Sequence, residues 1–119
     1  MAYRVDISLS ALADAEAAYF WVKERAPHRA GDWYEGLLET IFSLETFPER
    51  CPIAPESEDV GKDIRQLFYG KRAGMYRILF GLAHDPATGE DVVRIYRIRH
   101  ASRQDVTVEE IAEGESNEY

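Results

Sequence analysis

The hydrophobic pattern of this chain changes its period twice, and those changes limit the folds that it can form. Residues 3–9 (YRVDISL) alternate between apolar and polar side chains, which is typical of a half-buried strand. Apolar side chains then recur at helical spacing over 11–25 and over about 29–46, with a break at Ala26-Pro27, because proline disfavours helical geometry in the residue before it. Alternation returns in three later runs, at 64–69, 75–83 and 92–99.

The segments between these later runs favour turns and loops. Segment 70–74 begins and ends with glycine, and 84–91 contains Asp-Pro and Thr-Gly pairs, so both are typical of hairpin turns. Segment 48–63 holds three prolines and several acidic residues, which predicts a surface loop. The order of elements therefore predicts an α+β fold, with an N-terminal strand, an antiparallel helical hairpin and a three-stranded antiparallel meander that together form one sheet.

The length of 119 residues predicts a single domain, which we place at residues 1–113. Near its end, Thr107 is expected to cap a short acidic helix that Gly114 ends. Residues 114–119 (GESNEY) are polar and charged, so they are predicted to form a flexible acidic tail.

The alternation also assigns side chains to faces of the predicted sheet. In the middle strand of the meander the core face is expected to carry Tyr76, Ile78, Phe80 and Leu82. Arg77 alternates with them and is expected to point away from the core, towards an open sheet surface. In the last strand Arg94 and Arg97 interrupt the alternation, which indicates a β-bulge or a basic, solvated end.

Charge is distributed unevenly along the chain, whose net charge is −8. Residues 60–103 hold nine Lys and Arg against four Asp and Glu, whereas residues 1–59 hold five against twelve. The last segment, 104–119, has six acidic residues and no basic one. A cluster of cations concentrates the electrostatic field where an anionic partner can dock, whatever the net charge.

Several classes of protein are not indicated by the sequence. The single cysteine, Cys51, excludes an internal disulfide and lies beside prolines in a segment that is expected to bury or half-bury it. There is no metal-ligand spacing and no phosphate-binding glycine loop, so we expect neither a metal nor another cofactor. Neither a signal peptide nor an 18-residue apolar run is present, so we expect a soluble cytoplasmic protein without a membrane partner.

The order of elements, together with three sets of residues, resembles the RelE/ParE family of toxins from bacterial type II toxin–antitoxin (plasmid stabilisation) modules. The three sets of residues are Arg65 at the start of the meander, Tyr76-Arg77 in the run GMYRILF, and His100 with Arg103 after the last strand. The resemblance covers residues 3–105. It implies a toxin that a co-encoded antitoxin neutralises in a hetero-oligomer.

The family contains two mechanisms, and the resemblance favours the ParE-like one. ParE-like toxins poison DNA gyrase, whereas RelE-like toxins cut messenger RNA in the ribosome. RelE-like nucleases carry lysines in the first meander strand and a C-terminal tyrosine. Here Arg65 and Leu67 occupy that strand, and Val106 and Thr107 come after the last strand. Gyrase is therefore the expected target. The alternatives are a ribosome-dependent mRNA endoribonuclease and a degenerate member that only binds partners.

The resemblance and the charges give two sets of candidate site residues. For a RelE-like nuclease the catalytic residues would be His100, Arg77 and Arg103, because RNA cleavage needs proton transfer and cations at the developing charge. For a partner-binding surface the residues are Arg65, Tyr76, Arg77, Arg97, Arg99 and Arg103, since arginine binds carboxylates through its planar fork. A third interpretation pairs the arginines with acids of the same fold. Trp21 and Trp33 are expected in the core or rim of the hairpin rather than in an exposed patch.

Overall fold

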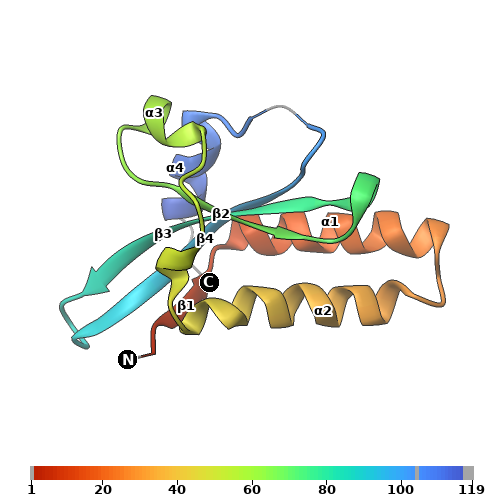
Figure 1. The fold of residues 1–119 in the computed structure, drawn as a ribbon, viewed down its shortest axis with the longest axis horizontal. Coiled ribbons are helices and arrows are strands. Elements are labelled where there is room, and N and C mark those ends of the chain that lie inside the picture. The colour runs from red at the N-terminus through yellow and green to blue at the C-terminus, as the bar shows by residue number, and fades with distance from the viewer. Residues whose placement is uncertain (1, 104, 117–119) are drawn as a thin grey trace.

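The fold has three layers, with a four-stranded sheet between a long helical hairpin and two short helices (Figure 1). The structure is a computed structural model, and it describes residues 2–103 and 105–116. The helices are α1 (Leu9–Arg25), α2 (Ala30–Phe42), α3 (Glu56–Val60) and α4 (Val108–Ser116). The strands are β1 (Arg4–Ile7), β2 (Arg65–Tyr69), β3 (Tyr76–Asp85) and β4 (Glu90–His100), and 3₁₀ turns lie at Ser43–Glu45, Pro48–Arg50 and Arg72–Gly74.

The sheet has the strand order β1-β4-β3-β2. Strands β2, β3 and β4 pair antiparallel and form the predicted meander, while β1 pairs parallel with β4. The predicted α+β class and order of elements are thus confirmed. Segment 48–63, predicted to be a loop, also contains α3 and one 3₁₀ turn. Strands β1 and β2 are left as the two edges of the sheet.

The helical hairpin has local signals at both ends of α1. Ser8 is the N-cap, and its hydroxyl oxygen accepts a hydrogen bond from the Ala11 N–H at 3.0 Å. The helix ends at Arg25, before the Ala26-Pro27 pair, as predicted. Small side chains on the inner face of α1 let it approach the sheet closely, and they are fully or almost fully buried: Ala11, Ala15 and Ala18. None of the described helices is long and apolar enough to cross a membrane.

The main core lies between the hairpin and the sheet. Ile78 and Phe80 of β3 are fully buried there against Leu37 and Ile41 of α2. Burying a side chain of this size stabilises the fold by roughly 1.5–3 kcal/mol relative to leaving it exposed. The core face predicted for β3 is therefore confirmed.

The opposite face of the sheet, which we call the back face, is also covered. Leu79 of β3 and Tyr96 of β4 form a second core with residues that precede β2 or follow β4, namely Ala54, Ile64, Val106 and Ile111. Helices α3 and α4 lie over this face in Figure 1. The expectation of an open sheet surface around Arg77 is therefore wrong, because the acidic loop and the C-terminal helix fold over it.

Strand β4 contains a β-bulge, which was one of the two alternatives that the sequence indicated. Leu79 pairs with Arg97 while its neighbour Phe80 pairs with Ile95, so Tyr96 is the extra residue. The bulge reverses the alternation and keeps apolar residues facing the hairpin core on both sides of it. It therefore explains why Arg94 and Arg97 interrupt the period-two pattern of the sequence.

Helix α4 begins as predicted but ends later. The Thr107 hydroxyl accepts from the Glu110 N–H at 3.1 Å, and the Glu110 carboxylate accepts from the Thr107 N–H at 3.0 Å, which is a capping box. Gly114 does not end the helix. A Cβ at this position would lie 2.4 Å from the Tyr96 carbonyl oxygen, so glycine is needed for close packing on β4. The helix continues to Ser116, and residues 117–119 of the predicted tail lie outside the described part.

Candidate functional site

Arg77 is held in a buried ion pair on the back face. Its exposed fraction is 6%, and its two terminal nitrogens donate to the Glu56 carboxylate at 2.8 and 2.6 Å. The Glu56 Oε2 also accepts from the Val106 N–H at 3.0 Å. Burial alone would raise the pKa of Glu56, but these hydrogen bonds lower it below its ordinary value. Arg77 therefore joins α3, β3 and the C-terminal segment.

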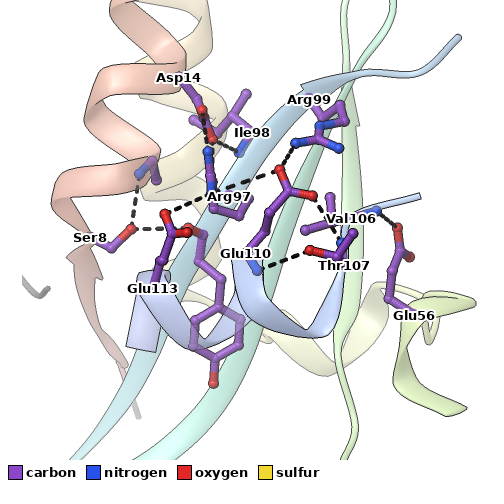
Figure 2. A network of polar contacts seen from close by, with 12 residues as sticks. Ser8, Asp14, Glu56, Arg97, Ile98, Arg99, Val106, Thr107, Glu110 and Glu113 are labelled. Atoms are coloured by element: carbon purple, nitrogen blue, oxygen red, sulfur yellow. Dashed lines mark hydrogen bonds and ion pairs between the residues drawn. The ribbon is translucent and has the colours of Figure 1, made fainter. Parts of the chain in front are cut away.

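Two further arginines of β4 are paired with acids of the same chain (Figure 2). The Arg97 guanidinium donates to the Asp14 carboxylate of α1 at 2.8 and 2.9 Å, and this hydrogen bonding raises the pKa of Arg97. Arg99 donates to Glu110 of α4. Burial would raise the pKa of Glu110, but the bond from Arg99 lowers it. Acidic side chains of α4 thus contact the basic side chains of β4, which the sequence predicted to bind a partner.

Arg65 also has an internal role. Its guanidinium donates to the backbone carbonyls of Glu49 at 3.1 Å and of Cys51 at 2.7 Å, so it holds the loop that precedes β2. Cys51 is buried as expected, with an exposed fraction of 3%, and burial raises the pKa of its thiol. The interpretation that the arginines pair with acids of the same fold describes Arg77, Arg97 and Arg99. Arg65 is also bonded within the fold, but to backbone carbonyls rather than to an acid.

His100 lies at the end of the sheet, on the hairpin side. Its Nε2 lies 2.6 Å from the Ala73 carbonyl oxygen, so we assign the ring proton to Nε2. Nδ1 then accepts from the Ser102 N–H at 3.1 Å and from the Ser102 hydroxyl at 2.6 Å. The edge of the ring packs on Tyr76, with 5.1 Å between the ring centroids. Both nitrogens of His100 are therefore engaged within the fold.

Of the predicted catalytic set, the structure brings together only His100 and Arg103. They line a pocket of about 440 Å³ with Tyr76 and Trp21. Arg77 follows Tyr76 in β3 and therefore lies on the opposite face of the sheet. Tyr76 is 8% exposed, and burial raises the pKa of its hydroxyl. The carboxylate that the described residues place in this pocket, that of Asp14, is paired with Arg97. The arrangement therefore supplies the cation of Arg103 and a bonded imidazole, with an acid that is already engaged.

A second pocket of about 740 Å³ adjoins the first and shares Trp21 and Tyr76 with it. We call the two together the end groove. Its aromatic wall consists of Trp21, Trp33, Tyr69 and Tyr76. Phe68 also lines the groove, but it pairs with Arg77 in the sheet, so its side chain lies on the back face. The rim carries the cations Arg29, Lys71 and Arg103, and Arg99, which donates to Glu110, also lines the smaller pocket.

The aromatic wall of the end groove is partly fixed by packing and partly exposed. The Trp33 ring lies 5.7 Å from Tyr69 and 5.4 Å from Tyr76, centroid to centroid. Trp33 packs against the core as expected, whereas Trp21 is 49% exposed. For Trp21 the alternative of an exposed surface is the better description. Exposed aromatic side chains beside a hollow are typical of protein-binding sites.

The cations on the rim differ from those of the back face. Across residues 2–103 and 105–116, no carboxylate forms an ion pair with Arg29, Lys71 or Arg103. Two carboxylates also line the groove: Asp32 in the larger pocket and Asp14, which is paired with Arg97, in the smaller one. The predicted site included Arg103 but not Arg29, Lys71 or Phe68. Arg29 lies between two helices and Lys71 lies between two strands, so no shared sequence pattern indicates that they line the same groove.

Within the described residues, no group of three or more His, Cys, Asp or Glu side chains could hold a metal ion. A search of curated proteins finds no match to this chain. A family model described as the ParE toxin of the type II toxin–antitoxin system parDE matches residues 5–105. This match covers most of the chain and ends before α4, so the chain belongs to the ParE toxin family.

Proposed function

We propose that this chain is the toxin of a type II toxin–antitoxin module, and that it acts by binding DNA gyrase rather than by chemistry of its own. Membership of the ParE family supports the role of a toxin in such a module. A toxin of this type implies a co-encoded antitoxin that binds it in a hetero-oligomer. In this proposal the free toxin works in the cytoplasm, where it meets gyrase and stalls the enzyme with its DNA cleaved.

The choice of mechanism rests on the contacts of the residues that a nuclease would need. Cleavage by attack of a ribose hydroxyl requires a base, an acid and cations at one place. Arg77 is buried against Glu56 on the other face of the sheet, and both nitrogens of His100 are already bonded. Among the described residues at the end groove, only Arg103 of the predicted catalytic set keeps an unpaired polar group. This set supports binding better than catalysis.

The proposal is tested by inducing the chain alone in bacteria and pulse-labelling DNA and protein synthesis in the first minutes. We expect incorporation of thymidine to stop early while translation continues, with full-length messages on RNA blots. Early loss of translation with cut messages would overturn the proposal and support the endoribonuclease. The His100→Ala variant is the control for that alternative, because it would abolish cleavage by a nuclease but leave the binding of gyrase largely intact.

A further inference from the structure

Strand β2 has an outer edge that is covered along only part of its length. At its start, the Gln66 N–H donates to the Pro52 carbonyl at 3.0 Å, and the Ala54 N–H donates to the Ile64 carbonyl at 2.7 Å. These bonds close the edge from residue 64 to residue 66. They also show that Gln66 directs its N–H outward, away from β3.

Beyond Gln66 the edge is open. Backbone direction alternates along a strand, so Phe68 directs its N–H and carbonyl outward as Gln66 does, while Leu67 and Tyr69 pair with β3. Over the described part of the chain, neither backbone group of Phe68 has an assigned partner outside the strand. An edge strand with unpaired groups can accept a strand from another chain.

The open edge adjoins the end groove. Phe68, Tyr69, Gly70 and Lys71 all line the larger pocket, whose opposite wall includes Trp21 and Trp33. A strand laid on the edge would place alternate side chains towards this aromatic wall. Its remaining length would pass Lys71, which has no carboxylate partner among the described residues.

The charges indicate what kind of segment fits. The chain as a whole carries −8, which repels an acidic partner, but the groove rim carries Arg29, Lys71 and Arg103. Two carboxylates line the groove, and one of them, that of Asp14, is already paired with Arg97, which leaves Asp32 to oppose these cations. The other basic region, on β4, is occupied by Asp14, Glu110 and Glu113 of the chain itself. Charge complementarity therefore favours the end groove as the surface for an acidic segment.

We infer that an extended acidic segment of the antitoxin pairs with the outer edge of β2 at Phe68, with apolar side chains in the end groove and carboxylates on Lys71 and Arg29. The inference rests on the proposed function only in naming the antitoxin as the source of the segment. The backbone of Phe68 supplies the hydrogen bonds, and the aromatic wall selects apolar residues at alternate positions.

The test uses the full chain labelled with ¹⁵N and a capped probe peptide, Val-Glu-Val-Glu-Val-Glu, followed by amide spectra. We expect shifts at Phe68, Gly70 and Lys71 and in the Trp21 indole, and none at Arg97, which does not line the groove. The matched control is Val-Lys-Val-Lys-Val-Lys, which the net charge of the protein would attract but the groove rim repels. Absence of binding by the acidic peptide, equal binding by the basic one, or shifts confined to α4 and β4 would overturn the inference.

Two variants separate the backbone from the side chain. Phe68→Pro removes an outward N–H that β3 does not use, and we expect it to weaken peptide binding about tenfold or more. Phe68→Ala keeps that N–H and should weaken binding only about threefold. Lys71→Glu should weaken it about three- to fivefold, and less in high salt. Equal binding by Phe68→Pro, with an unchanged melting temperature, would contradict strand pairing.

A second pair of probes keeps the inference testable if Phe68→Pro does not fold. The acidic peptide is methylated on the backbone nitrogens either of all Val residues or of all Glu residues. Because alternate N–H groups of a strand point to the same edge, only one of the two methylated peptides should lose binding. Equal binding by both would contradict strand pairing. These assays do not involve gyrase, so the inference and the proposed target can fail separately.

Discussion

The back face of the sheet and the end groove both contain arginines, but they use them differently. On the back face each of Arg77, Arg97 and Arg99 donates to a carboxylate of the same chain, and the two acids that belong to α3 and α4 have lowered pKa values. In the end groove Arg29 and Arg103 have no such partner among the described residues. The difference teaches that a basic strand in this sequence marks internal structure, whereas dispersed cations on turns mark the accessible surface.

The back face also distinguishes the family domain from the C-terminal segment. The family match ends at residue 105, and α4 begins at Val108. The carboxylates of Glu110 and Glu113 lie on Arg97 and Arg99 of β4, and Ile111 is fully buried in the back-face core. The acidic C-terminal segment is therefore an integral cover of the back face in this chain.

Among these variants, removal of the Arg77 side chain should change the stability of the fold most. We expect Arg77→Ala to lower the free energy of unfolding by about 3–5 kcal/mol, because it leaves the Glu56 carboxylate buried and unpaired. Urea denaturation followed by circular dichroism measures the change. The matched variant Arg103→Ala should lie within about 0.5 kcal/mol of the parent. Equal stability of the two variants would contradict the assignment of Arg77 to the interior.

A second prediction concerns the packing of α4. Gly114→Ala should destabilise the fold by about 1–3 kcal/mol, since the added Cβ would meet the Tyr96 carbonyl at 2.4 Å. Gly31→Ala is the control, because a Cβ there meets no atom within 4 Å and alanine favours helix. Thermal melts of both variants provide the measurement. If Gly114→Ala were as stable as Gly31→Ala, α4 would not be packed on β4 as described.

The paired acids make stability depend on pH in a defined direction. The pKa values of Glu56 and Glu110 are lowered in the folded state, so their contribution is present above the ordinary value near 4.5 and is lost as pH falls through the folded pKa. Urea unfolding at pH 7 and at successive values down to pH 3 should show this loss. Glu110→Gln should lose less stability than the parent over the same range. An equal or steeper loss would contradict the role of Glu110.

The smallest expected effect on stability belongs to the groove rim. The double variant Lys71→Ala with Arg29→Ala should unfold within about 0.5 kcal/mol of the parent, because both side chains are exposed and neither has an ion-pair partner among the described residues. Its affinity for a partner that uses the groove should nevertheless fall. A loss of stability comparable to that of Arg77→Ala would remove the contrast between the two regions.

Much of the fold could be predicted from the sequence because it depends on local periodicity. The order of elements, the hairpin break at Ala26-Pro27, the bulge near Arg97 and the cap at Thr107 all follow from patterns a few residues long. The end of α4 was predicted wrongly because glycine normally ends a helix. At Gly114 the absence of a side chain instead allows a close contact with Tyr96, a residue 18 positions earlier in the chain. No local pattern reveals this contact.

The candidate site was harder to predict, because alternation assigns a side chain to a face but does not say what covers that face. Arg77 does point away from the hairpin core, yet Glu56 and Val106, each about twenty or more residues away, enclose it. The end groove combines Trp21 from α1, Phe68 from β2 and Arg103 from beyond β4. Such a juxtaposition depends on the tertiary fold and leaves no mark in any one segment.

The most direct test of the proposed mechanism uses purified chain with DNA gyrase, ATP and a relaxed plasmid, with the reaction stopped by detergent and protease. We predict that the amount of linear plasmid rises with the concentration of the chain, and that the His100→Ala variant produces similar amounts. The mechanism would be contradicted if gyrase continued its normal supercoiling with no linear DNA while the same preparation cut messenger RNA in a translating extract.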